Sequence, residues 1–165
     1  MSVNKHRPHV LVLPEDDANR SLARGFEKSL DPVVANRFQV MPESNGWLKV
    51  LEKFTSEYAA NLNRYPNRHV ILLIDFDGKS DRGAFVKERI PYEVKERVYV
   101  LGAKNEPQDL SRRLESSFES IGHALALECR NGTNKTWMHA HLEHNAGELD
   151  RLNRQVRTFL FPSDS

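Results

Sequence analysis

Acidic side chains follow three of the most apolar runs of this sequence, where their type and position could support chemistry. They are Glu15, Asp75, Asp77 and Glu106. Carboxylates brought within a few ångströms of one another repel, and they stay ionised together only when a cation lies among them. Oxygen ligands suit Mg²⁺ or Mn²⁺, which also bind phosphate oxygens. The pattern therefore predicts a divalent-ion site with Asp75, Asp77 and Glu106 as ligands, and chemistry on a phosphodiester.

Glu15 has a different role in this hypothesis. A carboxylate outside the metal shell can act as a general acid or base, so we expect Glu15 to be the catalytic group. Contacts to phosphate or substrate are expected from Gly46, Lys79, Arg82 and Lys104. The three cations lie close to the acids in the sequence, and the amide of Gly46 precedes a helix, where amides can meet a phosphate.

The same residues also have an ordinary structural interpretation. Asp and Gly after a strand are common turn formers, and Asp16 or Asp17 can cap the helix that follows. In that interpretation the acids hold no ion and the chain is a scaffold subunit. One such acid would indicate little, whereas acids at three strand ends favour the metal site.

Four short apolar runs predict the sheet that must bring the acids together. They lie at 9–13, 38–41, 69–74 and 97–102. Their length and apolar content are typical of buried strands, and helical patterns separate them. We therefore predict an α/β fold of three layers, with a mostly parallel sheet of about four strands. The run 69–74 lacks alternation, which indicates a strand covered on both faces.

Two rules of sheet geometry then place the acids at one site. Ligands of an open parallel sheet bind beyond the carboxyl ends of its strands, which is where the four acids fall. Side chains at positions i and i+2 of a strand point the same way, so we expect Asp75 and Asp77 to share a direction. Gly78 allows the backbone to turn sharply just after them.

Apolar spacing also predicts the helices. They are 17–30, 47–58, 83–88, one continuous helix over 110–132, and a last helix that carries Leu149, Leu152 and Val156 and ends near 161. The polar segment 61–68 is predicted to be a loop. We predict a single domain over 1–165, in which an α/β core over 8–107 carries a helical C-terminal extension over 108–165.

Composition excludes several classes of protein. The chain has 165 residues, with 24 Lys and Arg against 23 Asp and Glu and a net charge of +1. This balance argues against a strongly basic, non-specific nucleic-acid binder. No apolar run approaches the roughly 18–20 residues that cross a bilayer, so no membrane partner is expected. The single cysteine, Cys129, allows neither an internal disulfide nor a thiolate metal cage, and we expect a cytoplasmic protein.

The segment 9–107 resembles a Toprim domain, the metal-binding fold of topoisomerases, primases and related nucleases. The resemblance rests on VLVLPEDDANR around Glu15 and on VILLIDFDG around Asp75 and Asp77. It implies that Glu15 is the general acid/base or a metal ligand, and that the two aspartates bind Mg²⁺. Glu106, in GAKNEP, resembles the additional acid that follows the fourth strand in some nuclease-type members.

The Toprim resemblance also implies a function and partners. Members of this kind cleave nucleic acid, and small ones often act beside a separately encoded ATPase in DNA repair or phage defence. The family often has Gly after the glutamate, and this chain has Asp16 there.

The N-terminal region also resembles a response-regulator receiver domain, in VLVLPEDDANRSLARGFEKSL and FQVMPESNGWLKVLEKF. This second resemblance implies a non-enzymatic signalling or binding module, in which Asp16 and Asp17 bind Mg²⁺ and Asp75 accepts a phosphoryl group. Receivers have Ser or Thr after the fourth strand, where this chain has Gly102 and Ala103. They also have a Lys after a fifth strand, and no clear fifth strand is visible here.

A group of histidines near the C-terminus has the composition of a zinc site. It consists of His139, His141 and His144. We predict instead that these are polar surface or hydrogen-bonded residues, because 139 and 141 do not share a helical face. Cys129, among apolar helical neighbours, is predicted to be a buried, inert thiol. Trp47 and Trp137 are predicted to be packing residues.

Overall fold

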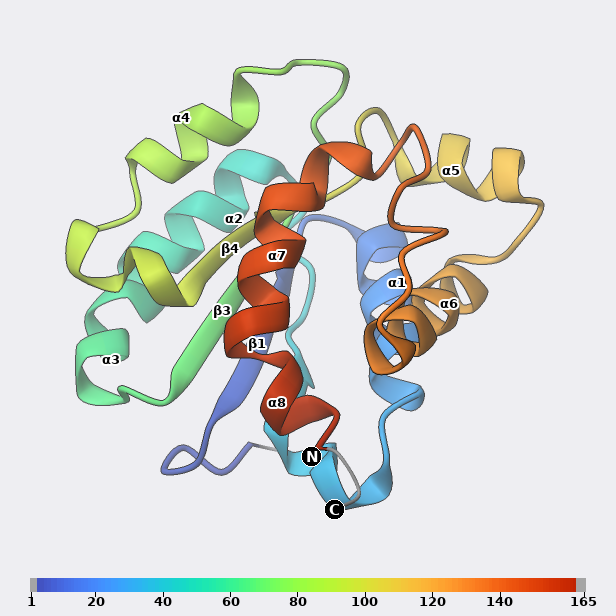
Figure 1. The fold of residues 1–165 in the computed structure, drawn as a ribbon. Helices are drawn as coiled ribbons and strands as arrows, with labels where there is room; N and C mark the ends of the chain where they lie inside the picture. Colours follow the sequence, from blue (N-terminus) through green and yellow to red (C-terminus); the bar gives the residue numbers. More distant parts are fainter. Residues whose placement is uncertain (1–2, 163–165) are drawn as a thin grey trace.

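A four-stranded parallel sheet forms the centre of the structure, a computed structural model that describes residues 3–162 (Figure 1). Its strands are β1 (His9–Pro14), β2 (Phe38–Val40), β3 (Arg68–Leu73) and β4 (Val98–Leu101). They lie in the order β2-β1-β3-β4, and each neighbouring pair is parallel. The predicted α/β class and its four strands are therefore confirmed.

Helices cover both faces of this sheet (Figure 1). They are α1 (Asp17–Lys28), α2 (Trp47–Lys53), α3 (Ala59–Arg64), α4 (Arg82–Glu88), α5 (Pro107–Leu114), α6 (Phe118–Asn131), α7 (Ala146–Gln155) and α8 (Arg157–Leu160). Short 3₁₀ segments at Pro32–Arg37, Tyr92–Arg97 and Glu143–Asn145 add to them. No helix among the described residues is both long enough and apolar enough to cross a membrane.

Alternation along the strands divides the apolar side chains between two cores. Val70 and Leu72 of β3 pack with the helices α2, α3 and α4 on one face. Ile71 and Leu73 pack with α1, α7 and α8 on the other face. All four side chains are at most 8% exposed, as expected for a strand that is covered on both sides.

The second helix runs further than its apolar spacing predicts. A π-helical turn at Phe54–Tyr58 joins α2 to α3, so helical structure continues to Arg64. The prediction of a loop starting at 61 is therefore wrong. Leu62 explains the difference, because its side chain is fully buried in the core beside α2 and thereby stabilises another turn.

The single helix predicted over 110–132 is also wrong, because the chain breaks after α5. Glu115 takes a left-handed conformation with φ of 50°, which ends α5. Ser117 then caps α6, since its side chain accepts a hydrogen bond from the amide of Ser120. The apolar spacing stays in register across the break, so periodicity alone does not reveal it.

Two glycines allow α6 to pack closely on α1. A Cβ atom at Gly25 would lie 2.1 Å from the carbonyl oxygen of Glu119, and one at Gly122 would lie 2.0 Å from that of Leu22. No larger residue fits at either position without moving the backbone. The C-terminal region is thus packed directly on the first helix of the core.

Helix α7 runs along the free edge of β4. Side chains in and just before this helix bond to alternate residues of β4 and to the residue that follows the strand. Arg151 bonds to Val98, Glu148 to Val100 and Asn145 to Gly102. Glu148 is 6% exposed and its Oε2 atom accepts from the Val100 amide at 2.7 Å. These bonds satisfy backbone groups that an open edge would leave for another chain.

Candidate functional site

The site that the sequence predicts lies where β1 and β3 end side by side. Pro14 pairs with Leu73 in the sheet, and the amide of Glu15 continues the ladder by donating to the carbonyl of Leu73 at 2.9 Å. The side chain of Glu15 then turns to β3, where its Oε2 atom accepts from the amide of Asp75 at 2.6 Å. Glu15 and Asp75 are therefore brought together as predicted.

The carboxylate of Asp75 is buried against the first turn of α1. Its Oδ1 atom accepts from Asn19 Nδ2 at 2.9 Å, and the same nitrogen donates to Asp16 Oδ1 at 2.9 Å. Asp16 also caps α1, because its Oδ1 atom accepts from the amide of Asn19. The helix cap and the acidic site therefore share residues, so the two interpretations of Asp16 are not exclusive.

Sequence reasoning missed Asn19, which is 1% exposed. The sequence shows only that Asn19 lies three residues after the capping Asp16, whereas its burial, which requires hydrogen-bond partners, is visible in the structure alone. Its amide nitrogen links the acid that precedes α1 to the acid that follows β3. Asn19 is thus a positioning residue for Asp75.

Burial and mutual repulsion perturb the acids at this position. Burial raises the pKa of Asp75 to about 7, against the Asn19 hydrogen bond, and the charges of Asp16 and Glu15 add to the rise. Burial also raises the pKa of Glu15, opposed by the Asp75 amide and assisted by Asp16 and Asp77. Ionising both groups is therefore unfavourable unless positive charge is brought in.

Arg82 supplies positive charge next to these acids. Its Nη1 atom donates to the carbonyl of Asp75 at 2.7 Å and to Asp77 Oδ2 at 2.8 Å. The guanidinium lies 4.6 Å from the centre of the Trp47 ring and is buried, with the Nε atom lacking a partner among the described residues. Trp47 packs as predicted, and it also holds Arg82 in place.

Asp75 and Asp77 do not point the same way, although strand alternation predicts it. β3 ends at Leu73, and Asp77 has a left-handed backbone with φ of 49°. The alternation rule does not apply to such a turn. Asp75 therefore faces α1, whereas the exposed Asp77 faces Arg82.

The turn that carries Gly46 wraps over the end of β1. The amides of Asn45 and Gly46 both donate to the carbonyl of Glu15, at 2.7 Å and 3.3 Å. Gly46 has φ of 144°, which a side chain would disfavour. Its amide is thus already bonded, and the turn orients Glu15 instead of presenting a free donor to phosphate.

The remaining predicted residues lie on the loops that follow β3 and β4. Glu106 is exposed immediately before α5, and its side chain does not cap that helix. Lys79 and Lys104 are exposed, and no ion pair to them is seen among residues 3–162. The backbone of Lys104 bonds to Gly78 and His141, which ties the loop after β3 to the C-terminal region.

The carboxylates of the site are suitable ligands for a hard divalent cation, but they are not already arranged around one ion position. Carboxylate oxygens are the ligands that Mg²⁺ and Mn²⁺ prefer. Within residues 3–162, however, no three Asp, Glu, His or Cys side chains are placed to share one ion. An ion held by both Asp75 and Asp77 would require the ion pair between Arg82 and Asp77 to open.

The histidines and the cysteine take structural positions. His139 accepts from the amide of His141, and their rings stack with centres 5.5 Å apart. His144 contacts the ring of Phe76 edge-on. Burial raises the pKa of the Cys129 thiol to about 11, so it is protonated at neutral pH, as predicted for an inert group.

Comparisons of the chain with protein-family models, with curated proteins and with solved structures gave no match. The site must therefore be interpreted from its own geometry.

Proposed function

We propose that this chain carries out Mg²⁺- or Mn²⁺-dependent phosphodiester chemistry on nucleic acid. One observation carries the proposal, the meeting of Glu15 and Asp75 at the adjacent ends of β1 and β3. Both carboxyl groups have a raised pKa, and negative neighbours contribute to each rise. A cation at this position would relieve that repulsion.

Each acidic or basic residue has a part in the proposal. Asp75 and Asp77 would hold the ion once Asp77 is released from Arg82, and Glu106 would complete its shell. When bound, Mg²⁺ polarises a phosphodiester and stabilises the leaving oxygen. Glu15 takes or gives a proton, and burial raises the pKa of this group above its ordinary value, as suits that role. Arg82, once released from Asp77, pairs with a phosphate oxygen.

The proposal extends to partners as the Toprim resemblance implies them. Nucleic acid is the substrate, and a separately encoded ATPase is a candidate partner in DNA repair or phage defence. Lys79 and Lys104, exposed on the loops after β3 and β4, would meet the backbone phosphates. A cytoplasmic location belongs to the same proposal.

Calorimetry with Mn²⁺ tests the site directly. The parent should bind the ion, and the double variant Asp75→Asn with Asp77→Asn should lose binding while it remains folded. Asp31→Asn with Asp150→Asn is the matched control, because it removes two exposed carboxylates outside the loops of the site. Equal binding by the parent and the Asp75/Asp77 variant, or no binding by either, would remove the proposal and favour a scaffold.

Cleavage is the second measurement. Supercoiled plasmid and single-stranded oligonucleotides are incubated with the chain and Mn²⁺, and nicking should depend on Glu15. Ion binding without cleavage of either nucleic acid would overturn the assignment of the chain alone as a nuclease. Adding a candidate ATPase then tests whether the partner is required.

A receiver-like signalling module is the second candidate, and the strand order favours it. The order β2-β1-β3-β4 equals the first four positions of the 2-1-3-4-5 sheet that receivers share. Asp75 follows β3, and its carboxylate and that of Asp16 both accept a hydrogen bond from Asn19 Nδ2. However, α7 lies at the edge where a fifth strand would pair.

Acetyl phosphate separates this candidate from the nuclease. An acid-labile phosphoryl adduct that is lost in Asp75→Asn would favour the receiver-like module. Nicking that is lost in Glu15→Gln, without such an adduct, would favour the nuclease.

A further inference from the structure

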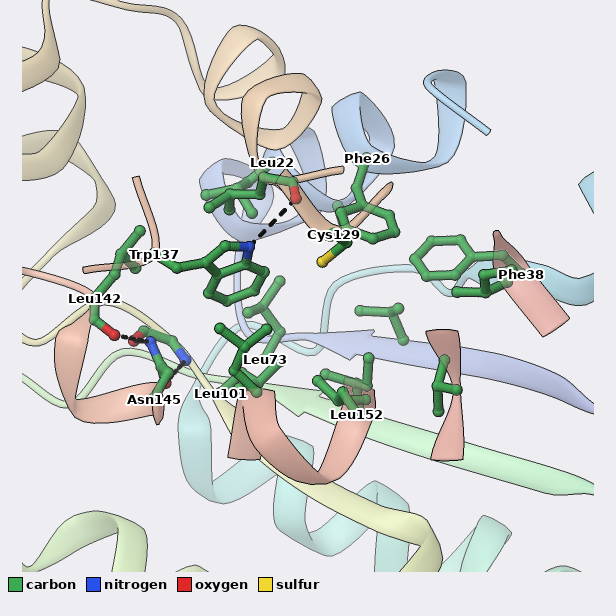
Figure 2. Close-up of a pocket in the computed structure, with 18 of the residues that line it drawn as sticks. Leu22, Phe26, Phe38, Leu73, Leu101, Cys129, Trp137, Leu142, Asn145 and Leu152 are labelled. Carbon is green, nitrogen blue, oxygen red and sulfur yellow. Dashed lines mark hydrogen bonds between the residues drawn. The ribbon is translucent and has the colours of Figure 1, made fainter. Parts of the chain in front are cut away.

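A narrow apolar cavity lies between the sheet and the helices that cover β3 and β4 (Figure 2). Its volume is about 90 Å³. Leu73 and Leu101 form its floor, and Leu22, Trp137 and Leu152 form walls around it. The cavity thus lies on the sheet face away from α2, α3 and α4.

Water is a poor occupant of this space. The volume is about three times the ~30 Å³ that a water molecule occupies in the liquid, so space alone does not exclude it. A buried water needs two to four polar partners, however, and the side chains around the cavity are almost all apolar. Asn145, one polar wall residue, already bonds with Gly102 and Leu142.

The cavity borders a hollow that leads to the surface. This hollow has a volume of about 590 Å³. Five residues line both spaces, and they are Cys129, Trp137, Leu149, Asn153 and Arg157. The hollow and the cavity are therefore neighbours, and a ligand that enters the cavity from this side has to pass between these side chains.

Two charged side chains at this mouth, Arg157 and Glu128, already have hydrogen-bond partners in the protein. Arg157 donates through Nε to the carbonyl of Cys129 at 2.7 Å. Glu128 accepts from the amides of Thr136 and Trp137 at 2.7 Å and 3.3 Å. A charged ligand group would have to compete with these bonds, whereas an uncharged polar group would not.

We propose that this cavity binds a small molecule with a compact apolar group and one uncharged polar end. The apolar group, no larger than a small ring or a short alkyl chain, fills the space above Leu73 and Leu101. The polar end stays at the mouth, beside Asn153. Apolar cavities of about 150 Å³ in proteins take up benzene, so a ring requires this cavity to expand by about two-thirds, and a short alkyl chain requires less.

The binding site is separate from the acidic site on the same sheet. Of the residues described, Asn19 is the one that lines the cavity and also bonds to Asp75. The proposed metal ligands Asp75, Asp77 and Glu106 do not line the cavity, so the proposal does not depend on metal binding or on cleavage of nucleic acid.

Benzyl alcohol is the first probe, because it joins a small ring to a hydroxyl group. At tenfold excess over its Kd, it should raise the melting temperature of the chain by about 3–6 °C. Emission of Trp137 reports the location, measured in a Trp47→Phe background so that one tryptophan remains. Glycerol, benzoate and benzylamine are the comparison probes, and all three should bind at least tenfold more weakly.

Filling the cavity tests whether the probe binds there. Ala23 is 4% exposed and lines the cavity, so Ala23→Leu should abolish both the melting shift and the change in Trp137 emission. Ala60→Leu is the matched control, because Ala60 is exposed on α3 across the sheet. Leu152→Phe replaces Ala23→Leu if that variant does not fold.

Two results would overturn the proposal. If benzyl alcohol gives no response in the parent up to its solubility limit, the cavity is an ordinary packing defect. An equal response in Ala23→Leu or Leu152→Phe would place binding elsewhere. A charged probe that binds as tightly as benzyl alcohol would contradict the uncharged polar end.

Discussion

The Oε2 atom of Glu15 accepts a hydrogen bond of 2.6 Å from the backbone amide of Asp75, sixty residues away in the sequence. This bond joins the ends of β1 and β3, the two central strands of the sheet. It also keeps one carboxylate beside a second that is buried and bonded by Asn19. The relationship between these two residues is therefore both structural and electrostatic, and suitable variants can separate the two contributions.

Glu15→Gln and Glu15→Ala separate the chemical role of Glu15 from its structural role. Gln keeps an oxygen that can accept from the Asp75 amide, whereas Ala leaves that amide without its partner. We expect Ala alone to lower the free energy of unfolding appreciably, by about 1–3 kcal/mol in urea denaturation. Both variants should reduce Mn²⁺-dependent nicking by about 100-fold or more. A Gln variant that nicks at the parent rate would exclude Glu15 as the acid or base.

The stability of the chain should depend on pH through Asp75. Its pKa is raised from 3.8 to about 7 in the folded chain, so the folded state holds the proton more tightly than the unfolded state. The stabilisation from this proton is full below about pH 4 and is lost as the pH rises to about 7.

Asp75→Asn removes this dependence because an amide does not ionise. Without divalent ions, the variant should gain about 1–3 kcal/mol in unfolding free energy relative to the parent between about pH 4 and pH 7. Denaturation in urea at several pH values measures the difference, with the exposed Asp150→Asn as control. A difference that does not change with pH would show that Asp75 ionises normally.

Arg82→Gln tests the competition between this guanidinium and a metal ion for Asp77. The side chain of Arg82 is buried and that of Asp77 is partly exposed. An ion pair of this kind contributes about 1 kcal/mol to the free energy of unfolding. Removing it should tighten Mn²⁺ binding by about fivefold and raise the KM for nucleic acid, since a phosphate contact is lost. Arg89→Gln, an exposed arginine just after α4, is the control. Weaker Mn²⁺ binding in Arg82→Gln would contradict the competition.

Glu148 should stabilise the edge of the sheet through its bond to Val100. Glu148→Ala leaves the buried amide of Val100 without an acceptor, so we expect the free energy of unfolding to fall by about 1–3 kcal/mol. Glu148→Gln keeps one oxygen for this amide and should be less harmful, although it weakens the ion pair with Arg151. Urea denaturation measures both, and equal losses would show that the ion pair matters more than the amide.

The left-handed residue between α5 and α6 offers a stabilising substitution. Glu115 has φ of 50°, a conformation that glycine adopts without strain. Glu115→Gly should therefore raise the melting temperature, through a gain of about 1 kcal/mol. Glu115→Ala, which removes the side chain but keeps the Cβ atom, should not. A loss of stability in the glycine variant would mean that the Glu115 side chain, not its backbone, determines the turn.

The sequence alone determined the strands and the position of the acids relative to them. Strands that are buried on both faces must be apolar along their whole length, so runs such as 69–74 are visible without any structure. Acids that follow parallel strands lie at the same edge of the sheet, so the sequence indicates that edge. The contact between Glu15 and Asp75 also requires β1 to lie beside β3, and the strand order that provides this comes from the structure.

Only the tertiary structure decided where the side chains point and where the helices break. Asp77 turns to Arg82 because its backbone is left-handed, and the bond from Asn19 to Asp75 joins two elements that no local pattern connects. Periodicity continues through Glu115, yet the helix does not. Helix α7 covers the edge of β4 through polar side chains that look like surface residues in the sequence. Such contacts depend on distant residues meeting in space, which a local pattern of apolar and polar residues does not encode.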